Sequence, residues 1–231
     1  MKKTLWMMAA VVAAALTACG GNKTQQTDNV EVEAPAQELA FIRMNCDLTV
    51  SPENHDQVVE LGKQLVAASL NDEGVIGYDI MESISRPGKM LIFETWKDQA
   101  SLDKHMASTH FTTLVPQIQN LGTLEIKQIN QPKEVNLDPA KPFRLNILKT
   151  TAQRDAYIEA VQWGISESNK EEGCVLYDYY KSLTKDDTLL LLEIWKDQAA
   201  SDHHKELPHF TETQAKIKDM TASSTADRMA E

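Results

Sequence analysis

Apolar residues alternate with polar ones near the start of the globular part of the chain, at Ile42, Met44, Cys46 and Leu48. A period of two predicts a strand with one buried face. Ser51, Pro52 and Glu53 then supply an N-cap, a proline for the first helical turn and an early acid, and Gly74 suits a left-handed helix cap. The pattern predicts a helix between these positions.

Two further strands follow at residues 75–81 and 89–96, separated by the turn-forming stretch SISRPG. The second is apolar at nearly every position, which is typical of a strand covered on both faces. A polar helical segment, a break near Ser108 and Thr109, a second helical piece to about Asn120 and the strand TLEIKQIN complete the unit. The order β-α-β-β-α-β predicts the ferredoxin-like plan of an α+β fold.

The same pattern occurs twice in the chain. The stretch ETWKDQASLDKHMASTHF, from Glu94 to Phe111, returns 99 positions later as EIWKDQAASDHHKELPHF, with ten of 18 positions identical. NDEGVIGYDI at residues 71–80 likewise corresponds to KEEGCVLYDY at residues 170–179. Each unit has about 90 residues, far more than a solenoid repeat, so we expect two domains.

We expect the first domain at residues 40–130 and the second at residues 143–231, with the proline-rich, charged residues 131–142 as a linker. Pro208 falls where the second helical piece of the second domain would begin, which supports the break. The last strand of this domain is in doubt, because TASSTADRMAE has no apolar alternation. A four-stranded sheet with helices on one face leaves its other face bare, and two such sheets in one chain can cover each other.

The first residues have the layout of an export signal. Two lysines, an apolar run from Leu5 to Leu16 and small residues before Cys19 predict a signal peptide at residues 1–18, because the run is too short to remain as a membrane span. Leu16-Thr17-Ala18-Cys19 resembles the lipobox of bacterial lipoproteins, which implies that Cys19 is lipidated; an ordinary cleaved signal is the alternative. The polar residues 19–39 cannot bury enough surface to fold and are expected to form a flexible tether.

The net charge excludes some classes of binding partner, and the positions of the cysteines bear on disulfide formation. Removing Lys2 and Lys3 from the 23 basic residues leaves 21 against 34 acidic ones, a net charge of −13, which argues against nucleic acid and anionic headgroups. The lipid would then anchor the protein at the bacterial cell envelope, by default on the periplasmic face of the outer membrane. Cys46 and Cys174 lie in apolar strand patterns and are expected to be free, with a disulfide as the alternative.

A recurring set of residues links the chain to a known family. Glu94-x-Trp96 ends the third strand, a histidine follows nine positions after the tryptophan and another five positions further on, and EG-x-x-x-Y precedes them. The two sets are Glu94, Trp96, His105, His110, Gly74 and Tyr78, then Glu193, Trp195, His204, His209, Gly173 and Tyr177. With these residues the chain resembles the antibiotic biosynthesis monooxygenase family, and within it most the quinol monooxygenase branch, over nearly its whole length between the tether and Met220.

Members of that family usually pair two identical chains into a dimeric α/β barrel. The resemblance therefore implies that this chain forms such a barrel by itself, as an intrachain pseudo-dimer with one pocket per half. Members with activity oxidise quinol-like or polycyclic phenols with O2 and use neither metal nor flavin, so the resemblance implies no cofactor and a small aromatic molecule as partner. The family also includes proteins with no demonstrated chemistry.

Such an oxidation needs a base that removes the phenolic proton and a water-poor pocket. Histidine is a usable base near neutrality, so His105 and His204 are the candidate catalytic residues. The alternative is that each caps a helix or bonds a backbone carbonyl. His110 and His209, at the start of the second helical piece, are assigned to the substrate pocket, again with a structural role as the alternative.

Six further residues are assigned to the substrate pocket: Trp96, Trp195, Tyr78, Tyr177, Asn45 and Asn146. The tryptophans are candidates to stack on a flat aromatic substrate, with packing at the end of a core strand as the alternative. Haem-degrading relatives combine a first-strand asparagine with a tryptophan and a second-helix histidine. This chain departs from their spacing, so haem cleavage is disfavoured.

Glu94 and Glu193 lie inside apolar strands, where a carboxylate must be paired or protonated. We expect an ion pair with Arg43 or Arg144 of the neighbouring first strand, and an acid with a perturbed pKa is the alternative. No metal site is expected, because histidines five apart across a helix break do not share a face and no carboxylate or cysteine completes a ligand set.

These features favour a cofactor-independent monooxygenase that oxidises a quinol-like or other small aromatic molecule with O2 at the cell envelope. The alternative is a non-catalytic lipoprotein module that binds a small hydrophobic ligand. An isomerase acting on a small carbonyl sugar derivative, as in some relatives, is a third hypothesis.

Overall fold

The structure, a computed structural model, describes residues 38–231. The predicted signal peptide at residues 1–18, the lipidated Cys19 and the tether up to residue 37 lie outside the described residues. From residue 38 onward, no helix is long and apolar enough to cross a membrane.

The first half begins with strand β1 (Leu39–Val50) and a 3-10 turn (Pro52–Asn54) that leads into helix α1 (His55–Ser69). The elements β2 (Val75–Ser83), β3 (Lys89–Trp96), α2 (Gln99–Met106), α3 (Thr109–Leu121) and β4 (Gly122–Pro132) follow. Ser108 caps α3 by accepting a hydrogen bond from the Phe111 N–H, and Gly74 has a φ of +82°. The predicted helix break and the left-handed conformation of Gly74 are confirmed, but Gly74 does not cap α1, whose C-cap is Leu70.

The second half repeats this order with β5 (Phe143–Thr150), α4 (Arg154–Ser168), β6 (Cys174–Ser182), β7 (Thr188–Trp195), α5 (Gln198–Glu206), α6 (Pro208–Ile217) and β8 (Ser223–Ala230). Pro208 opens α6, as its place in the sequence indicated. The doubtful last strand does form: β8 pairs with β5 from Ser223, opposite Thr150, to Ala230, opposite Phe143. Backbone pairing with β5 supports this strand although its side chains show no apolar alternation.

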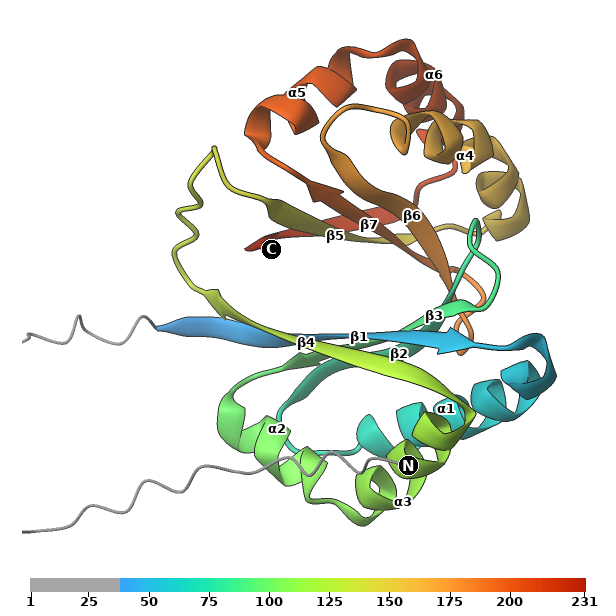
Figure 1. The fold of residues 1–231 in the computed structure, drawn as a ribbon, viewed down its shortest axis with the longest axis vertical. Coiled ribbons are helices and arrows are strands. Elements are labelled where there is room, and N and C mark those ends of the chain that lie inside the picture. Colours follow the sequence, from blue (N-terminus) through green and yellow to red (C-terminus); the bar gives the residue numbers. More distant parts are fainter. Residues whose placement is uncertain (1–37) are drawn as a thin grey trace, which may run out of the picture. The chain divides into compact units, whose positions relative to one another are not determined.

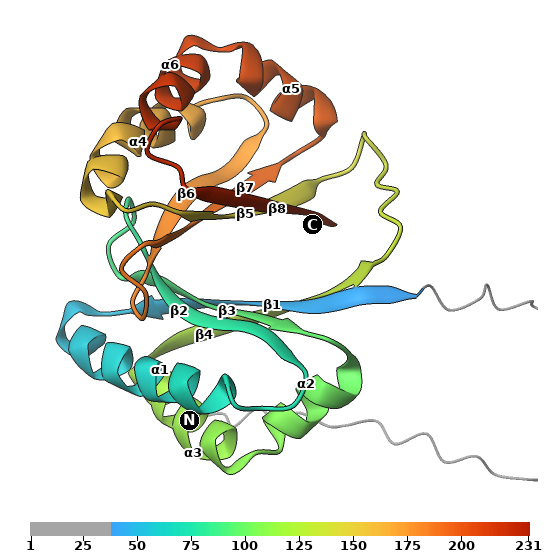
Figure 2. The ribbon, with the colours of Figure 1, turned by 180° about the vertical axis from the view of Figure 1, so that it is seen from behind.

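The eight strands form one antiparallel, curled half-barrel sheet in the order β4-β1-β3-β2-β6-β7-β5-β8. A short ladder between β2 and β6, from Met81 opposite Ser182 to Ser83 opposite Tyr180, joins the two ferredoxin-like halves. The strands of the two halves form two facing layers, a first sheet of β4-β1-β3-β2 and a second sheet of β6-β7-β5-β8, which only this ladder joins within residues 38–231. Helices α1–α3 cover the outer face of the first sheet and α4–α6 the outer face of the second (Figures 1 and 2). The inner faces of the two sheets are directed toward each other.

A third hydrophobic cluster, separate from the two cores beneath the helices, lies between the sheets; it consists of Met81, Leu91, Phe93, Tyr180, Leu190, Leu192 and Ile194, with Leu176 packed against it. The prediction that each sheet covers the bare face of the other is confirmed. It also explains why β3 and β7 are apolar at nearly every position, because both of their faces are buried.

One detail of the sequence-based prediction was wrong. β1 was expected to bury one face, but all residues from Ile42 to Cys46 are buried. The second half covers the face that carries Arg43 and Asn45, which are 5% and 0% exposed. A period-two pattern therefore located the strand but did not show that its polar face lies inside the pseudo-dimer.

Reciprocal hydrogen bonds fasten the two halves at the ends of β2 and β6. The carboxylate of Asp178, in β6, accepts hydrogen bonds from Ser83, Ser85 and Arg86. At the equivalent place Asp79, in β2, accepts hydrogen bonds from the Ser182 and Thr184 hydroxyls. An intrachain pseudo-two-fold arrangement requires such an exchange, because each half contacts the other through equivalent positions.

Candidate functional site

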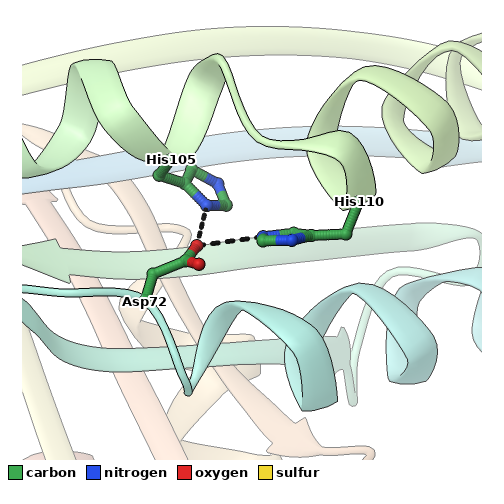
Figure 3. Close-up of side chains that lie close together, drawn as sticks. All are labelled: Asp72, His105 and His110. Atoms are coloured by element: carbon green, nitrogen blue, oxygen red, sulfur yellow. Dashed lines mark hydrogen bonds and ion pairs between the residues drawn. The ribbon is translucent and has the colours of Figure 1, made fainter.

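A carboxylate bridges two histidines beneath the helices of the first half (Figure 3). Asp72 lies in the turn after α1, His105 in the last turn of α2 and His110 in the first turn of α3. His105 Nδ1 is 2.7 Å and His110 Nε2 is 2.9 Å from the same Asp72 oxygen, Oδ2. The bend at Ser108 turns the two imidazole rings toward one point.

The second half contains the same arrangement with a longer acid. His204 Nδ1 and His209 Nε2 each lie 2.7 Å from Glu171 Oε1. The expectation that the paired histidines do not converge, and that no carboxylate completes their set, was therefore wrong in both halves. The acid lies 33 residues before the first histidine, so no local spacing indicated it.

The ring of His105 is almost completely enclosed, with 1% exposure. Its centroid lies 4.5 Å from that of Trp96, 5.4 Å from Tyr78 and 5.0 Å from Phe111. Burial lowers the pKa of His105, an effect that the hydrogen bond to Asp72 opposes. With Nδ1 directed at Asp72, the other nitrogen, Nε2, is buried and has no hydrogen-bond partner within residues 38–231.

In each half, the buried strand acid accepts a hydrogen bond from the tryptophan two residues later. Trp96 Nε1 donates to Glu94 Oε2 at 2.8 Å, and Trp195 Nε1 donates to Glu193 at the same distance. Both tryptophans are 0% exposed. They pack in the two cores and orient the acids. Their position therefore matches packing at the end of a core strand, the alternative to stacking on a substrate.

The expected ion pairs of these acids with Arg43 or Arg144 were wrong. Arg43 donates to Thr95 and pairs with Asp227 of the second half, while Arg144 pairs with Glu231 at 2.7 Å. The arginines point to the inner face of the sheet, whereas Glu94 points to the helices, because successive side chains of paired strands alternate between faces.

Among residues 38–231, Glu94 consequently has no cationic partner, although it is buried. Burial raises its pKa to about 7, against the opposing hydrogen bond from Trp96. The Cys46 thiol lies 3.9 Å from Glu94 Oε1, and burial also raises the pKa of Cys46 and that of Tyr78. Burial raises the pKa of Glu193 as well, so the alternative of a perturbed acid applies in both halves.

Glu94 lies on the wall of a cavity of about 70 Å³ between the first sheet and α1–α3. The polar groups on the wall are those of Glu94, Tyr78 and Cys46, and the rest is apolar: Met44, Leu65, Ile92, Leu102, Met106, Phe111, Val115, Leu124 and Ile126. Neither Trp96 nor His105 is part of the lining, and both lie behind it. Sequence reasoning did not assign Glu94, Cys46 or the apolar wall to the pocket, since the residues come from six different elements.

The two asparagines lie elsewhere, at the contact between the halves. Asn146 Nδ2 is 3.4 Å from Asn45 Oδ1, and Asn146 lines a separate cavity of about 290 Å³ between the sheets. Asn45 alternates with Met44 and Cys46, so it faces away from the cavity of Glu94. Cys46 and Cys174 are both free, and the alternative of a disulfide between them is not realised.

Comparisons with known proteins agree with this fold. The chain is 34% identical over 77 residues to an uncharacterised Synechocystis protein, sll1783, covering 33% of this chain and 52% of that protein. It is 32% identical over 71 residues to the Bacillus subtilis protein named "Putative monooxygenase YcnE", covering 31% of this chain and 75% of that one. The chain thus spans about half the length of the first relative.

A solved structure of a conserved Bacteroides thetaiotaomicron protein of unknown function is 35% identical, covers 38% of this chain and 95% of its own, and has a TM-score of 0.38. The family model described as "Antibiotic biosynthesis monooxygenase" matches residues 41–117 and again residues 150–216. Because these two segments make up more than half of the chain, the protein belongs to the antibiotic biosynthesis monooxygenase family, as a tandem duplication of its domain.

Proposed function

We propose that the protein is a cofactor-independent monooxygenase that oxidises a quinol-like aromatic molecule with O2 in the cavity of the first half. Membership of the family and a relative named as a monooxygenase support the reaction class. The single observation that favours this site is Glu94, a buried acid with a pKa of about 7 on the wall of a mostly apolar cavity. A general base works best when its pKa lies near the working pH.

In the proposed reaction, ionised Glu94 accepts the proton of a substrate hydroxyl, and the electron-rich anion then reacts with O2. One oxygen atom forms a new bond to the aromatic ring, and the other leaves as water with two hydrogens from the substrate. A hydroquinone and O2 thus give a hydroxyquinone and water. The apolar wall keeps bulk water away from the reactive anion.

His105, the candidate base of the sequence analysis, has a different role in this proposal. Its ring is packed against Trp96, and Trp96 in turn donates to Glu94. Since His105 is not on the cavity wall, we assign it as a positioning residue that holds Trp96 against the acid. The bridge from Asp72 fixes its orientation.

The cavity must widen to admit a ring. A cavity of about 150 Å³ suffices for benzene, roughly twice the volume present. Met106 and Ile126 form the accessible rim, with 38% and 56% exposure. A methionine side chain changes rotamer readily, so outward rotation of Met106 is the proposed opening step.

The test is O2 uptake with menadiol, corrected for uncatalysed oxidation, in the wild type, Glu94→Gln and Glu193→Gln. Loss of the base is expected to lower kcat/KM by about 100-fold or more. Glu193→Gln makes the same change beside the other tryptophan and should stay within about twofold of the wild type, because a site away from the chemistry does not alter the barrier.

The pH profile provides a second readout of this experiment. In the wild type kcat/KM should rise as the pH passes through about 7 and Glu94 ionises, and Glu94→Gln should lack this limb. Uptake that is equal with and without protein would contradict the proposal. Menadiol binding without uptake would instead favour the non-catalytic binding module.

We also propose that the protein acts at the cell envelope, where a lipid on Cys19 would hold it close to lipid-soluble quinols. Fractionation of cells that produce Cys19→Ser tests this location. The variant should move from the membrane fraction to the soluble fraction, and a protein that is soluble in both forms would contradict the anchor.

A further inference from the structure

The carboxylate-bridged histidines of the second half contain an acid oxygen with no partner. Glu171 Oε1 lies 2.7 Å from His204 Nδ1 and 2.7 Å from His209 Nε2. Glu171 Oε2 is buried and has no hydrogen-bond donor within the described part of the chain, and the side chain as a whole is 8% exposed. Because an unpaired buried carboxylate oxygen is costly, this position calls for a cation.

The three side chains form a recognisable ligand set. One ligand atom from each of Glu171, His204 and His209 can be chosen so that all lie within 4.8 Å of one another. Ligands bound at about 2.1 Å to one tetrahedral ion lie roughly 3.4 Å apart, so small rotations suffice to place an ion among them. Two imidazoles and one carboxylate, with positions left for water, suit a divalent transition metal such as zinc.

A route from solvent reaches the acid. A surface hollow of about 480 Å³ is bordered by Glu171 together with Glu172, Asp197 and His203. The rim carries three carboxylates against one lysine, Lys196, which pairs with Glu172 at 3.4 Å, so the remaining negative charge favours the approach of a cation. His209 does not line the hollow and is 8% exposed.

The corresponding set of the first half differs in one respect. The shorter acid, Asp72, has a side chain that is 21% exposed, as is that of His110. Its carboxylate is therefore partly hydrated, and neither of its oxygens is among the buried, unpartnered atoms of residues 38–231. The case for a cation is stronger in the second half, where the acid is withdrawn from water.

We propose that Glu171, His204 and His209 bind one divalent transition-metal ion of the zinc class, with water in the remaining positions. The ligands come from the turn before β6 and from helices α5 and α6. The ion would tie this turn to both helices, so its role is structural. It lies in the half that the proposed oxidation does not use.

Zinc retention by the full-length protein tests the proposal. The protein is stripped with EDTA, equilibrated with a small excess of Zn²⁺, separated from free metal by gel filtration and analysed for zinc by mass spectrometry. The wild type should retain zinc, and Glu171→Gln and His209→Gln should each retain one equivalent less per chain. Zn²⁺ should also raise the Tm of the wild type more than that of either variant.

Two further histidine-to-glutamine variants serve as controls for the number of zinc ions per chain. His110→Gln makes the same change in the first half and reports any ion held there separately. His55→Gln removes a histidine outside both sets, bound to Glu82, and should leave the zinc content unchanged. A wild type without zinc, or variants at Glu171 and His209 that retain as much as the wild type while their circular dichroism remains native, would overturn the proposal.

Discussion

The two halves share a buried network but differ in the wall around it. In both, a tryptophan donates to a strand acid at 2.8 Å, and a carboxylate bridges two histidines. Three helix residues of the first cavity, Leu102, Met106 and Val115, correspond in the repeat to Ser201, Lys205 and Gln214. The cavity of the first half therefore combines residues that recur, such as Glu94 and Phe111, with an apolar helix wall that does not.

The edge strands β4 and β8 also differ, because the first half has the larger apolar side chain at the cavity. Ile126 lies opposite Cys46 on β1 and forms part of the cavity wall. Its counterpart Ala226 lies opposite Ile147 on β5. Beneath the helices, the fully buried Tyr157 and Tyr179 of the second half take the places of Val58 and Ile80. The second half has larger core residues and a more polar wall, which is why we assign the oxidation to the first half.

The largest expected effect concerns stability and its dependence on pH. The pKa of Glu94 is raised from 4.5 to about 7 on folding, so between these values the folded state holds a proton that the unfolded state has lost. The wild type should lose roughly 3 kcal/mol relative to Glu94→Gln as the pH rises from about 4.5 to about 7, and nothing further above it. Urea unfolding of both proteins at several pH values measures this difference.

Glu193→Gln is the matched control for this experiment, and its difference from the wild type should have the same sign, because burial also raises the pKa of Glu193. The stability of the wild type should thus be greatest at the acidic end of this range as far as these two groups are concerned. A stability difference between Glu94→Gln and the wild type that does not change with pH would show that Glu94 is ionised in the folded protein.

Exchanging one residue of the cavity wall between the two halves tests whether only the first half is active. Val115→Gln introduces the residue of the second half, and its amide should bring water into the cavity. We expect kcat/KM for menadiol to fall by about tenfold, the equivalent of 1.4 kcal/mol, which is within the range for an unpaired polar group in an apolar site. Gln214→Val, the reverse exchange, should leave activity unchanged. Equal losses in both variants would contradict the assignment to one half.

The smallest effect is expected at the rim. Met106→Ala shortens the side chain that must rotate outward, and we expect kcat/KM for a bicyclic quinol to rise by roughly threefold, within the range for one or two methylene contacts. A monocyclic hydroquinone should respond less, because it needs less widening. Steady-state kinetics with both substrates measure the ratio, and a fall for both would show that Met106 is needed for binding.

The sequence predicted most of the fold for a physical reason. Strand and helix periods, the helix break near Ser108 and the left-handed Gly74 are local features, and the duplication showed that both halves share them. The uniformly apolar sequence of β3 also indicated that both faces of this strand are covered, as they are where the two sheets face each other. β8 was the doubtful element, because a strand held by the backbone of β5 needs no apolar alternation.

The site was less predictable, because it depends on contacts between distant elements. Trp96, His105 and Tyr78 were recognised by their recurrence, yet recurrence could not show which of them faces a cavity. The partners of Glu94 and His105 lay outside any local pattern: a tryptophan took the place expected for Arg43, and Asp72 was overlooked. The direction of each side chain had to come from the three-dimensional structure.

Binding stoichiometry tests the central claim, that one half alone offers a working cavity, most directly. Titration of the full-length protein with menadione, the oxidised form of the assay substrate, should give one molecule per chain by calorimetry. That binding should weaken in Val115→Gln and persist in Gln214→Val. Two molecules per chain, or one whose binding is unaffected by Val115→Gln, would contradict the account.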